Sequence, residues 1–495
     1  QSVNRMSNVL ITGGSGYVGR CLVSQLLKET PNVKVTVFDL HSHPSFEKRE
    51  NVHTVIGSVT DYAALCYAMH GIDVVFHLAS YGMSGAPMLD EEKCWEVNVR
   101  GTENVLAACA KEGVKALLYC SSYNVVFGGV PISNGYERLP YFAAEKHTDA
   151  YSRSKTVAEQ KVLGCKDASL KVCAVRPAAI YGLGEERHFP RIVRMMDMGL
   201  FFFTFGERDS LVDWVHGDNL CFALKKAASK LVKEASQEGG GRETVHRQAF
   251  FISDGRPINQ WDFLRPIASA VRAPFPSLHI GLRPMLAFAF VSEMIHKLAV
   301  RIVGRALAPA PFLTRAEVVK CGVTHHFSVE KAERLLDYKL LVSPEEGIES
   351  LAVSLANRSA TEASENFFRS PAVIWWLLVC GGLWLTFACA LAEGKTPKSI
   401  PLSELPSVAL VSPLVPFRVL AETLFGGQQG VQVVAIAAAA AHVIEGVAAA
   451  FVAYRNGMQN TWVAWGFQTL IMGFPSFRLL LQRTQQYTGP RQVEK

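Results

Sequence analysis

Asn8-Val-Leu-Ile-Thr12 is followed without a break by Gly13-Gly-Ser-Gly-Tyr-Val-Gly19 and then by Arg20-Cys-Leu-Val-Ser-Gln-Leu-Leu-Lys28. The first stretch is a short β-forming run and the third has apolar residues at helical spacing, so the glycines lie where a strand passes into a helix. Glycines there let the backbone approach a pyrophosphate at the positive end of the helix, and the last one lets helix and strand pack closely. The stretch predicts a dinucleotide-binding unit; a merely tight turn is the alternative.

An acid, Asp39, ends the next predicted strand, 20 residues after Gly19. A carboxylate at this position accepts hydrogen bonds from an adenosine ribose and repels a 2′-phosphate, so it favours NAD over NADP. A turn acid at a strand end is the alternative. Four basic side chains that follow soften the preference: His41, His43, Lys48 and Arg49.

The same order of strand and helix repeats along the chain. Short apolar runs that each precede a helical pattern occupy residues 51–56, 74–79, 116–121 and 170–176. They predict an α/β fold with a doubly wound parallel (Rossmann) sheet within about 8–180, followed by a small C-terminal substrate-binding lobe within about 181–355. Ligands in such sheets bind at the carboxyl ends of the strands, where we find Ala79, Ser121, Ser122 and Pro177.

Tyr151-Ser-Arg-Ser-Lys155 places a phenol and an ammonium on one face of a predicted helix. A nearby cation stabilises a phenolate and lowers the pKa of the tyrosine toward neutrality, where it serves as a general acid or base. The pair suits alcohol and carbonyl chemistry, although in isolation it is also typical of a solvated helix surface.

Hydropathy separates the chain of 495 residues into a head and a tail. The residues from Pro371 to Leu481 are apolar with few charges, whereas the first 360 or so alternate as in a soluble protein. We therefore expect a head at 8–355, a linker at 356–371 and an all-α membrane domain at 372–482, with about three spans at 372–392, 431–454 and 462–481. Residues 405–424, rich in proline, are expected to be re-entrant or interfacial. His442 and Glu445 in the second span are expected to bind a partner or lipid headgroup, or to pack against other spans.

Charge and cysteine usage limit the partners. The net charge is +6, and no basic block carries interleaved aromatics, so an anionic membrane surface is a better partner than nucleic acid. The segment from Arg283 to Arg305 is expected to be an amphipathic helix, lying either against the membrane or over a lipid-like substrate. The 11 scattered cysteines predict reduced thiols in a cytosolic head. Four histidines lack ligand spacing, so we predict no metal: His77, His216, His325 and His326.

Several motifs together resemble the extended short-chain dehydrogenase/reductase family, in its 3β-hydroxysteroid dehydrogenase and sterol 4α-carboxylate dehydrogenase branch and nearest to the 42E type. They are Thr12-Gly-Gly-Ser-Gly-Tyr-Val-Gly19, His77-Leu-Ala-Ser80, Asn98-Val-Arg-Gly-Thr102, Cys120-Ser-Ser-Tyr-Asn-Val-Val-Phe127, Tyr151-Ser-Arg-Ser-Lys155, Arg176-Pro-Ala-Ala-Ile-Tyr-Gly182 and Val215-His-Gly-Asp-Asn219. Later motifs at 251–257, 311–315 and 331–338 extend the resemblance over about 8–355.

The resemblance implies an NAD-dependent oxidoreductase that oxidises a 3β-hydroxyl of a steroid or sterol, or reduces the corresponding ketone. Tyr151 would exchange the proton, Lys155 would hold the nicotinamide ribose and lower the pKa of Tyr151, and Ser122, favoured over Ser121, would hydrogen-bond the reacting oxygen. Ser58 replaces the acid that the family places on the adenine amine, which predicts weaker NAD affinity. The expected cofactor contacts are Gly13, Gly16, Tyr17, Val18, Gly19, Asp39, Val59, Ala79, Lys155 and Pro177.

Two other functions remain open. A sugar-nucleotide epimerase or reductase on the same scaffold would show arginines that clamp a diphosphate and would need no spans. An NAD-binding pseudo-enzyme or scaffold in a membrane complex is favoured by Ser58 and disfavoured by the intact Tyr151 and Lys155. For the dehydrogenase we expect a multi-pass protein of the endoplasmic reticulum with its head in the cytosol, in contact with membrane lipid and able to form a homodimer through the head.

Overall fold

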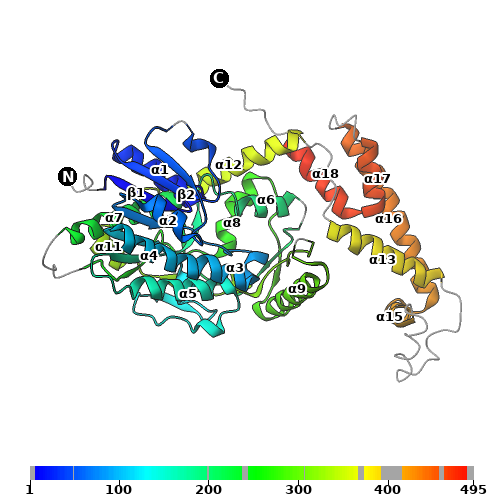
Figure 1. The fold of residues 1–495 in the computed structure, drawn as a ribbon. Helices are drawn as coiled ribbons and strands as arrows, with labels where there is room; N and C mark the ends of the chain where they lie inside the picture. The colour runs from blue at the N-terminus through cyan, green and yellow to red at the C-terminus, as the bar shows by residue number, and fades with distance from the viewer. Residues whose placement is uncertain are drawn as a thin grey trace. The chain divides into compact units, whose positions relative to one another are not determined.

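The chain forms two compact units in the computed structural model, which describes residues 6–47, 49–197, 200–236, 244–305, 307–365, 373–391, 415–455 and 462–487 (Figure 1). The first unit contains the residues up to Arg187 together with Phe203–Ile267 and Pro276–Ala352. The second contains His188–Phe202, Ala268–Phe275 and the residues from Val353 onward.

A seven-stranded sheet forms the centre of the first unit, in the order β11-β7-β5-β4-β1-β2-β3, and every neighbouring pair is parallel. The doubly wound parallel sheet is therefore confirmed. Its last strand lies beyond the predicted range of 8–180. The strands are β1 (Asn8–Thr12), β2 (Lys34–Asp39), β3 (Val52–Ile56), β4 (Val74–His77), β5 (Ala116–Cys120), β7 (Lys171–Pro177) and β11 (Ala249–Ile252).

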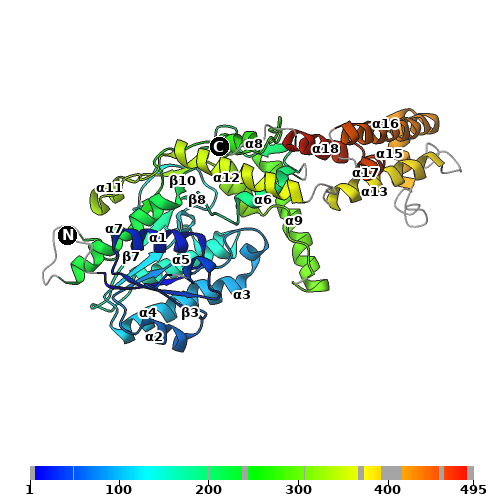
Figure 2. The same ribbon diagram turned by 90° about the horizontal axis from the view of Figure 1, so that it is seen from above.

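Helices cover both faces of this sheet (Figure 2). On β1, Val9 and Ile11 belong to one apolar core and Leu10 to the other, as the two-residue period of a strand requires. The first core is completed by α1 (Tyr17–Glu29) and α7 (Gly217–Ala235). The second core is completed by α2 (Tyr62–Met69), α4 (Gly101–Glu112) and α5 (Ala150–Leu163).

Smaller elements lie between or after the strands of this sheet along the sequence. Three two-stranded parallel pairs are β8 (Ala179–Tyr181) with β10 (Trp214–His216), β9 (Phe203–Phe205) with β12 (Leu278–Ile280), and β6 (Ile132–Gly135) with β13 (His325–Phe327). The remaining helices before residue 340 are α3 (Glu91–Cys94), the π-helical turn η4 (Trp95–Arg100), α6 (Phe189–Asp197), α8 (Gln260–Ala270), α9 (Leu282–Val303), α10 (Arg315–Gly322) and α11 (Glu330–Leu336), with short 3₁₀ turns η2 (Pro44–Phe46), η3 (Ala86–Leu89), η5 (Tyr123–Val125) and η6 (Ala144–Lys146).

The described residues of the C-terminal part of the chain are almost all helical. Its helices are α12 (Pro344–Glu365), α13 (Val373–Leu391), α15 (Val415–Phe425), α16 (Gln428–Arg455), α17 (Trp462–Met472) and α18 (Phe474–Tyr487). Among the described residues, α16 is the one helix long and apolar enough to cross a membrane. Residues 356–365, predicted as linker, continue α12, and 366–371 lie outside the described residues.

The range 462–481, predicted as a span, is divided between the helices α17 and α18. It breaks at Gly473, whose φ of +61° cannot continue a right-handed helix, and Pro475 lies at the start of α18. In the predicted re-entrant segment, residues 415–424 are helical, and 405–414 lie outside the described residues.

The helices α16 and α17 cross closely. A Cβ on Gly446 would lie 3.0 Å from the Cβ of Leu470 and 3.1 Å from the carbonyl oxygen of Gly466, so these glycines allow the approach. His442 Nδ1 lies 3.1 Å from the Leu470 carbonyl oxygen, which favours packing between helices among the roles expected for His442.

Candidate active site

Three hydroxyl groups gather at the carboxyl ends of β4 and β5. Tyr151 lies buried in the first turn of α5, and Ser122, which follows β5, and Ser80, which follows β4, lie near enough to its hydroxyl to lower its pKa through side-chain hydrogen bonding. Asp149 caps α5 by accepting a hydrogen bond from the backbone N–H of Ser152 at 2.8 Å, which fixes where the helix begins. The structure therefore brings Tyr151 and Ser122 together.

The neighbouring Ser121 does not join this cluster. Its backbone N–H donates to the Val175 carbonyl at 2.7 Å, and its hydroxyl is buried without a hydrogen-bond partner among the described residues. Of the two serines at this strand end, Ser122 is the one beside the phenol.

Lys155 follows one turn after Tyr151 and is 2% exposed. Its Nζ donates to the Cys120 carbonyl at 2.6 Å and lies 4.1 Å from the centroid of the Tyr119 ring. Burial lowers the pKa of Lys155 to about 8, and the charges of Cys120 and Glu159 act in the opposite direction.

Burial raises the pKa of Tyr151, which the hydrogen bonds with Ser122 and Ser80 partly oppose. The net pKa of Tyr151 thus lies above its ordinary value, and the lowering expected from Lys155 stays a prediction. The spacing of the two residues indicated a shared helix face, but it did not reveal that both groups are buried or that a backbone carbonyl binds the ammonium.

Asn98 is a site residue whose role the sequence did not reveal. It lies in η4, where its Nδ2 donates to the Tyr81 carbonyl and to Ser154 Oγ, both at 2.9 Å. Its Oδ1 accepts from the Tyr81 N–H at 2.8 Å and from Ser80 Oγ at 3.3 Å. Asn98 therefore connects the loop of Ser80 to α5. π-Helical turns are frequent at functional sites, but no periodicity in the sequence predicts one.

A buried ion pair anchors α5 below the site. Glu159 accepts from Arg176 Nε at 3.0 Å and from Nη2 at 2.6 Å, and from the Tyr141 hydroxyl at 2.9 Å. Because Arg176 belongs to β7, the pair ties α5 to the sheet.

The glycine turn lies against β4 and contacts Asp39. Gly13 has φ +71°, and a Cβ there would lie only 2.7 Å from the Ala79 backbone N. The Ser15 N–H donates to Asp39 Oδ2 at 2.9 Å. Gly16 is the N-cap of α1, and no side chain caps this end of the helix, so amide groups of its first turn face outward as an anion site requires. A Cβ on Gly19 would lie 2.4 Å from the Gly14 carbonyl oxygen, so close packing requires glycine.

Other predicted cofactor contacts belong to α1, to the loop between β3 and α2 and to the end of β7. The Tyr17 hydroxyl donates to the Tyr181 carbonyl at 3.1 Å, and burial raises the pKa of Tyr17. Val18 and Val59 pack into the two apolar cores. Pro177 is buried at the end of β7.

The Ser58 side chain is engaged locally. Its Oγ lies 2.8 Å from Thr60 Oγ1, and Asp61 caps α2 by accepting from the Ala64 N–H at 3.0 Å. The acid that follows Ser58 is therefore used to start a helix.

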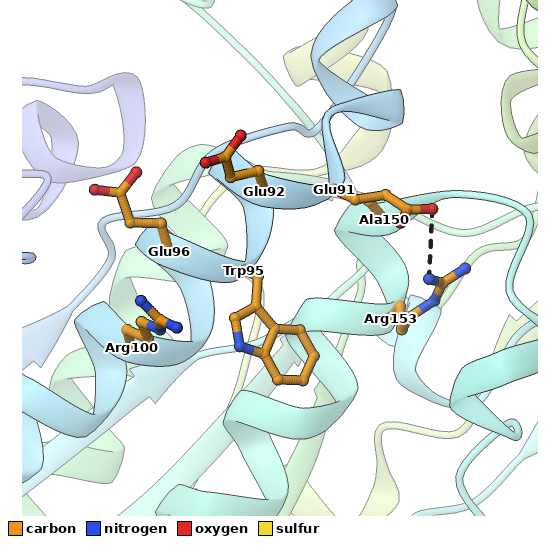
Figure 3. A pocket seen from close by; sticks show the side chains of 7 residues that line it. All are labelled: Glu91, Glu92, Trp95, Glu96, Arg100, Ala150 and Arg153. Atoms are coloured by element: carbon orange, nitrogen blue, oxygen red, sulfur yellow. Dashed lines mark ion pairs between the residues drawn. The ribbon is translucent and has the colours of Figure 1, made fainter.

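A surface hollow of about 620 Å³ is lined in part by Ala150, the residue that precedes Tyr151 in α5 (Figure 3). Glu91 and Arg153 form an ion pair at 3.6 Å on its wall, where Trp95 is exposed. Its lining comes from α3, η4 and the first turn of α5: Glu91, Glu92, Trp95, Glu96, Arg100, Ala150 and Arg153. The hydroxyl cluster is not part of that lining.

The histidines serve packing. His77 Nδ1 lies 2.7 Å from Thr12 Oγ1 and Nε2 lies 3.0 Å from Thr102 Oγ1, and burial lowers the pKa of His77 to about 3. His325 stacks on Phe127 with ring centroids 4.0 Å apart. Within the residues that the structure describes, no three His, Cys, Asp or Glu side chains are grouped as metal ligands.

Two protein families match the chain. The 3-beta hydroxysteroid dehydrogenase/isomerase family matches residues 10–278, and Transmembrane protein 254 matches residues 374–482. Short-chain dehydrogenase/reductase family 42E member 1 is 45% identical in Danio rerio, over 68% of this chain and 86% of that protein. The Homo sapiens protein of the same name is 41% identical over 79% of this chain and 98% of its own length. A 3 beta-hydroxysteroid dehydrogenase/Delta 5→4-isomerase of Mycobacterium tuberculosis is 32% identical over 69% of this chain and 89% of that protein.

Solved structures are similar in fold. The epimerase Mth375 of Methanothermobacter thermautotrophicus has a TM-score of 0.56 at 21% identity, covering 74% of this chain and 95% of that one. A dTDP-glucose 4,6-dehydratase of Streptomyces venezuelae with NAD bound has a TM-score of 0.54 at 20% identity, covering 72% and 97%.

Proposed function

The chain belongs to the 3-beta hydroxysteroid dehydrogenase/isomerase family, and from this we propose that it oxidises a 3β-hydroxyl of a steroid or sterol, or reduces the corresponding ketone. It is an NAD-dependent oxidoreductase type of enzyme. The observation that carries the proposal is the buried Tyr151, which lies beside Ser122 and Ser80 at the carboxyl edge of the sheet. This edge is where parallel sheets bind their ligands.

NAD is the cofactor that we assign to the head. The start of α1, which no side chain caps, suits a pyrophosphate. A Cβ on Gly13 would occupy the space that lets the glycine turn lie close to the backbone of Ala79. Asp39 lies beside Ser15, at the position where such folds hold an adenosine ribose. When bound, NAD takes up the hydride from the carbinol carbon of the substrate. We propose that Lys155 holds its nicotinamide ribose.

The residues of the chain handle the proton. In the direction of reduction, the raised pKa of Tyr151 keeps the phenol protonated, so that it can donate to the oxygen on which negative charge develops. Ser122 offers a second hydroxyl to the same oxygen. In the direction of oxidation the step runs in reverse, so Tyr151 must first release its own proton to solvent and then, as the phenolate, accepts the proton from the alcohol. Asn98 keeps the loop of Ser80 and α5 in register.

A direct test compares full-length protein in detergent with Tyr151→Phe, using NAD and a panel of 3β-hydroxysteroids. Loss of the hydroxyl leaves the ring in place, so we expect kcat to fall about 10²- to 10⁴-fold with NAD binding retained. Tyr67→Phe on α2, an exposed position, is the matched control. If wild type forms no NADH with any steroid, or if Tyr151→Phe is equally active, the proposal fails. Turnover of a sugar nucleotide in a parallel reaction would support the epimerase instead.

We further propose that the C-terminal helices anchor the enzyme in the endoplasmic reticulum membrane, with the head in the cytosol. The length and apolar character of α16 and the match of residues 374–482 to Transmembrane protein 254 support this, and α13 is proposed as another span. Protease protection in sealed microsomes tests it, since a cytosolic head is digested without detergent.

We also propose a homodimer through the head. Trp95 supports it, because exposed aromatic side chains are enriched at interfaces. Native mass spectrometry of wild type and Trp95→Glu tests this, and a monomeric wild type would refute it.

A further inference from the structure

The helices α1 and α7, which pack against one another, each carry a cysteine at their contact (Figure 2). Cys21 lies in the second turn of α1, and its thiol donates to Asp218 Oδ1, in the first turn of α7, at 3.4 Å. Cys221 lies further along α7, and its thiol donates to the Val18 carbonyl, in the first turn of α1, at 3.5 Å. Each sulfur therefore touches the residue three positions before the other cysteine. These reciprocal contacts place both thiols between the same turns of the two helices.

The two thiols differ in their access to solvent. Cys221 is 0% exposed; burial raises the pKa of its thiol, and Cys21 lies near enough to raise that pKa further through side-chain hydrogen bonding. Cys21 is only partly buried, so a small reagent can reach it. An oxidant from solvent therefore meets Cys21 first and finds Cys221 beside it. The Asp218 carboxylate disfavours the thiolate of Cys21, so the reaction should be slow.

We propose that Cys21 and Cys221 form a reversible disulfide when the head meets a hydroperoxide. In the first step the Cys21 sulfur attacks one peroxide oxygen, the O–O bond breaks, and the other oxygen leaves as water with the thiol proton. In the second step the Cys221 sulfur displaces the hydroxyl from the Cys21 sulfenic acid, and this oxygen leaves as water with the Cys221 proton. The two sulfurs lose two electrons together, and the peroxide is reduced to two waters.

A thiol such as glutathione reverses the reaction by exchange, which returns both cysteines to thiols and releases glutathione disulfide. Disulfides in cytosolic proteins are usually transient and redox-sensing. The reduced thiols expected for the head are therefore its resting state, and the disulfide is the state formed under oxidation.

The disulfide would act on the start of α1. Val18, whose carbonyl Cys221 contacts, follows the N-cap Gly16 by two residues and belongs to the turn to which we assign the pyrophosphate of NAD. Bonded sulfurs lie about 2.05 Å apart, well inside the contact distance of two thiols, so this turn must shift toward α7. Oxidation should therefore weaken NAD binding severalfold. This effect, unlike the disulfide itself, rests on the proposed function.

Mass spectrometry of the full-length chain in detergent tests the disulfide. Protein freed of reductant is treated with hydrogen peroxide for increasing times, the remaining thiols are blocked with N-ethylmaleimide, and the digest is searched for peptides joined through Cys21 and Cys221. We expect the joined peptides to accumulate over minutes to hours, within the usual range of disulfide formation, and to disappear after treatment with glutathione. Cys165→Ser, which removes another partly buried thiol, is the control and should leave them unchanged.

Removal of the second cysteine supplies the other arm. In Cys221→Ser the peroxide should leave Cys21 as a sulfenic acid that dimedone traps, whereas in wild type the disulfide forms in its place. Oxidised wild type should melt about 4–8 °C above the reduced protein, because the bond closes a long loop, and Cys221→Ser should show no such shift. Melting of the reduced variant shows whether it is folded, and Cys221→Ala replaces it if it is not.

Three results would overturn the proposal. They are a Cys21 thiol that N-ethylmaleimide still blocks after peroxide, a bond from Cys21 to any cysteine other than Cys221, and a joined pair that glutathione does not release. An NAD affinity that is equal in the oxidised and reduced protein would overturn the effect on the cofactor. The mass-spectrometric readouts depend neither on NAD nor on steroid turnover, so a failure of the proposed function is distinguishable from a failure of the disulfide.

Discussion

Replacement of Lys155 by methionine should make the head more stable while it abolishes turnover. Lys155 has a pKa of about 8 in the folded protein against an ordinary 10.5. Since each tenfold change in a protonation equilibrium is worth about 1.4 kcal/mol, keeping the ammonium buried costs about 3 kcal/mol at pH 7. Methionine has a similar length and no charge, but it forfeits the hydrogen bond to Cys120, worth about 1 kcal/mol. The net gain is about 2 kcal/mol.

The gain should depend on pH in a defined direction. Below pH 8 both the folded and the unfolded wild type carry the proton, so the full cost applies. Between pH 8 and 10.5 the unfolded state binds more protons, so wild type becomes more stable as pH rises and the advantage of the variant shrinks. At pH 10 the remaining cost is about 1 kcal/mol, which the lost hydrogen bond cancels.

Thermal melting of full-length protein in detergent, followed by intrinsic fluorescence, measures this difference. At pH 7 the head of Lys155→Met should unfold about 4 °C above wild type, at about 2 °C per kcal/mol for a large domain. Near pH 10 the two should coincide. Lys28→Met, at an exposed position, is the control. Two results would contradict the inference that burying the Lys155 ammonium destabilises the head. One is a Lys155→Met melting temperature at or below that of wild type at pH 7. The other is a melting temperature that stays above that of wild type at pH 10.

Three further outcomes are expected. Glu159→Gln should destabilise the head by about 3–5 kcal/mol in melting experiments, because it leaves the Arg176 guanidinium buried without its counter-charge. Adding Arg176→Met should restore part of the lost stability. A Glu159→Gln variant as stable as wild type would contradict this. Asp39→Ser should weaken NAD about tenfold and raise the relative affinity for NADP in fluorescence titrations, whereas unchanged affinities would exclude a ribose contact. Gly13→Ala should lower the melting temperature more than Gly71→Ala does. Both glycines have φ near +70°, but only a Cβ on Gly13 would lie close to another backbone atom, 2.7 Å from the Ala79 nitrogen. Equal melting temperatures of the two variants would argue against that close approach.

The parallel sheet was predictable because its signals are local. Each apolar run before a helical pattern became a strand within one or two residues of the predicted bounds at β1, β2, β3 and β5. The seventh strand, β11, was missed because it lies about 70 residues after β7 in the sequence. No local pattern indicates that β11 pairs with β7. The mean hydropathy over 462–481 likewise predicted one continuous segment, because an average does not register Gly473, whose positive φ ends the helix.

In the site, the sequence located the residues but not their environment. The spacing of Tyr151 and Lys155 predicted a common helix face. Their pKa values are shifted chiefly by burial, and the carbonyl that accepts from the Lys155 ammonium belongs to Cys120 at the end of β5. Asn98 stayed hidden for a similar reason, because its contacts depend on a π-helical turn and on a loop that follows another strand.

The regular spacing along α5 limits how the length of this enzyme can vary. Tyr151, Lys155 and Glu159 occupy successive turns, and the last of them is fixed to β7 through Arg176. A single inserted or deleted residue between Tyr151 and Glu159 would rotate one end of the helix by about 100° relative to the other. The phenol would then leave its serines, or the carboxylate would leave its arginine. We therefore expect insertions and deletions among functional relatives to fall in loops. Apart from Lys155, the identity of the residues between the phenol and the carboxylate should mark a competent head less well than their unbroken count of eight.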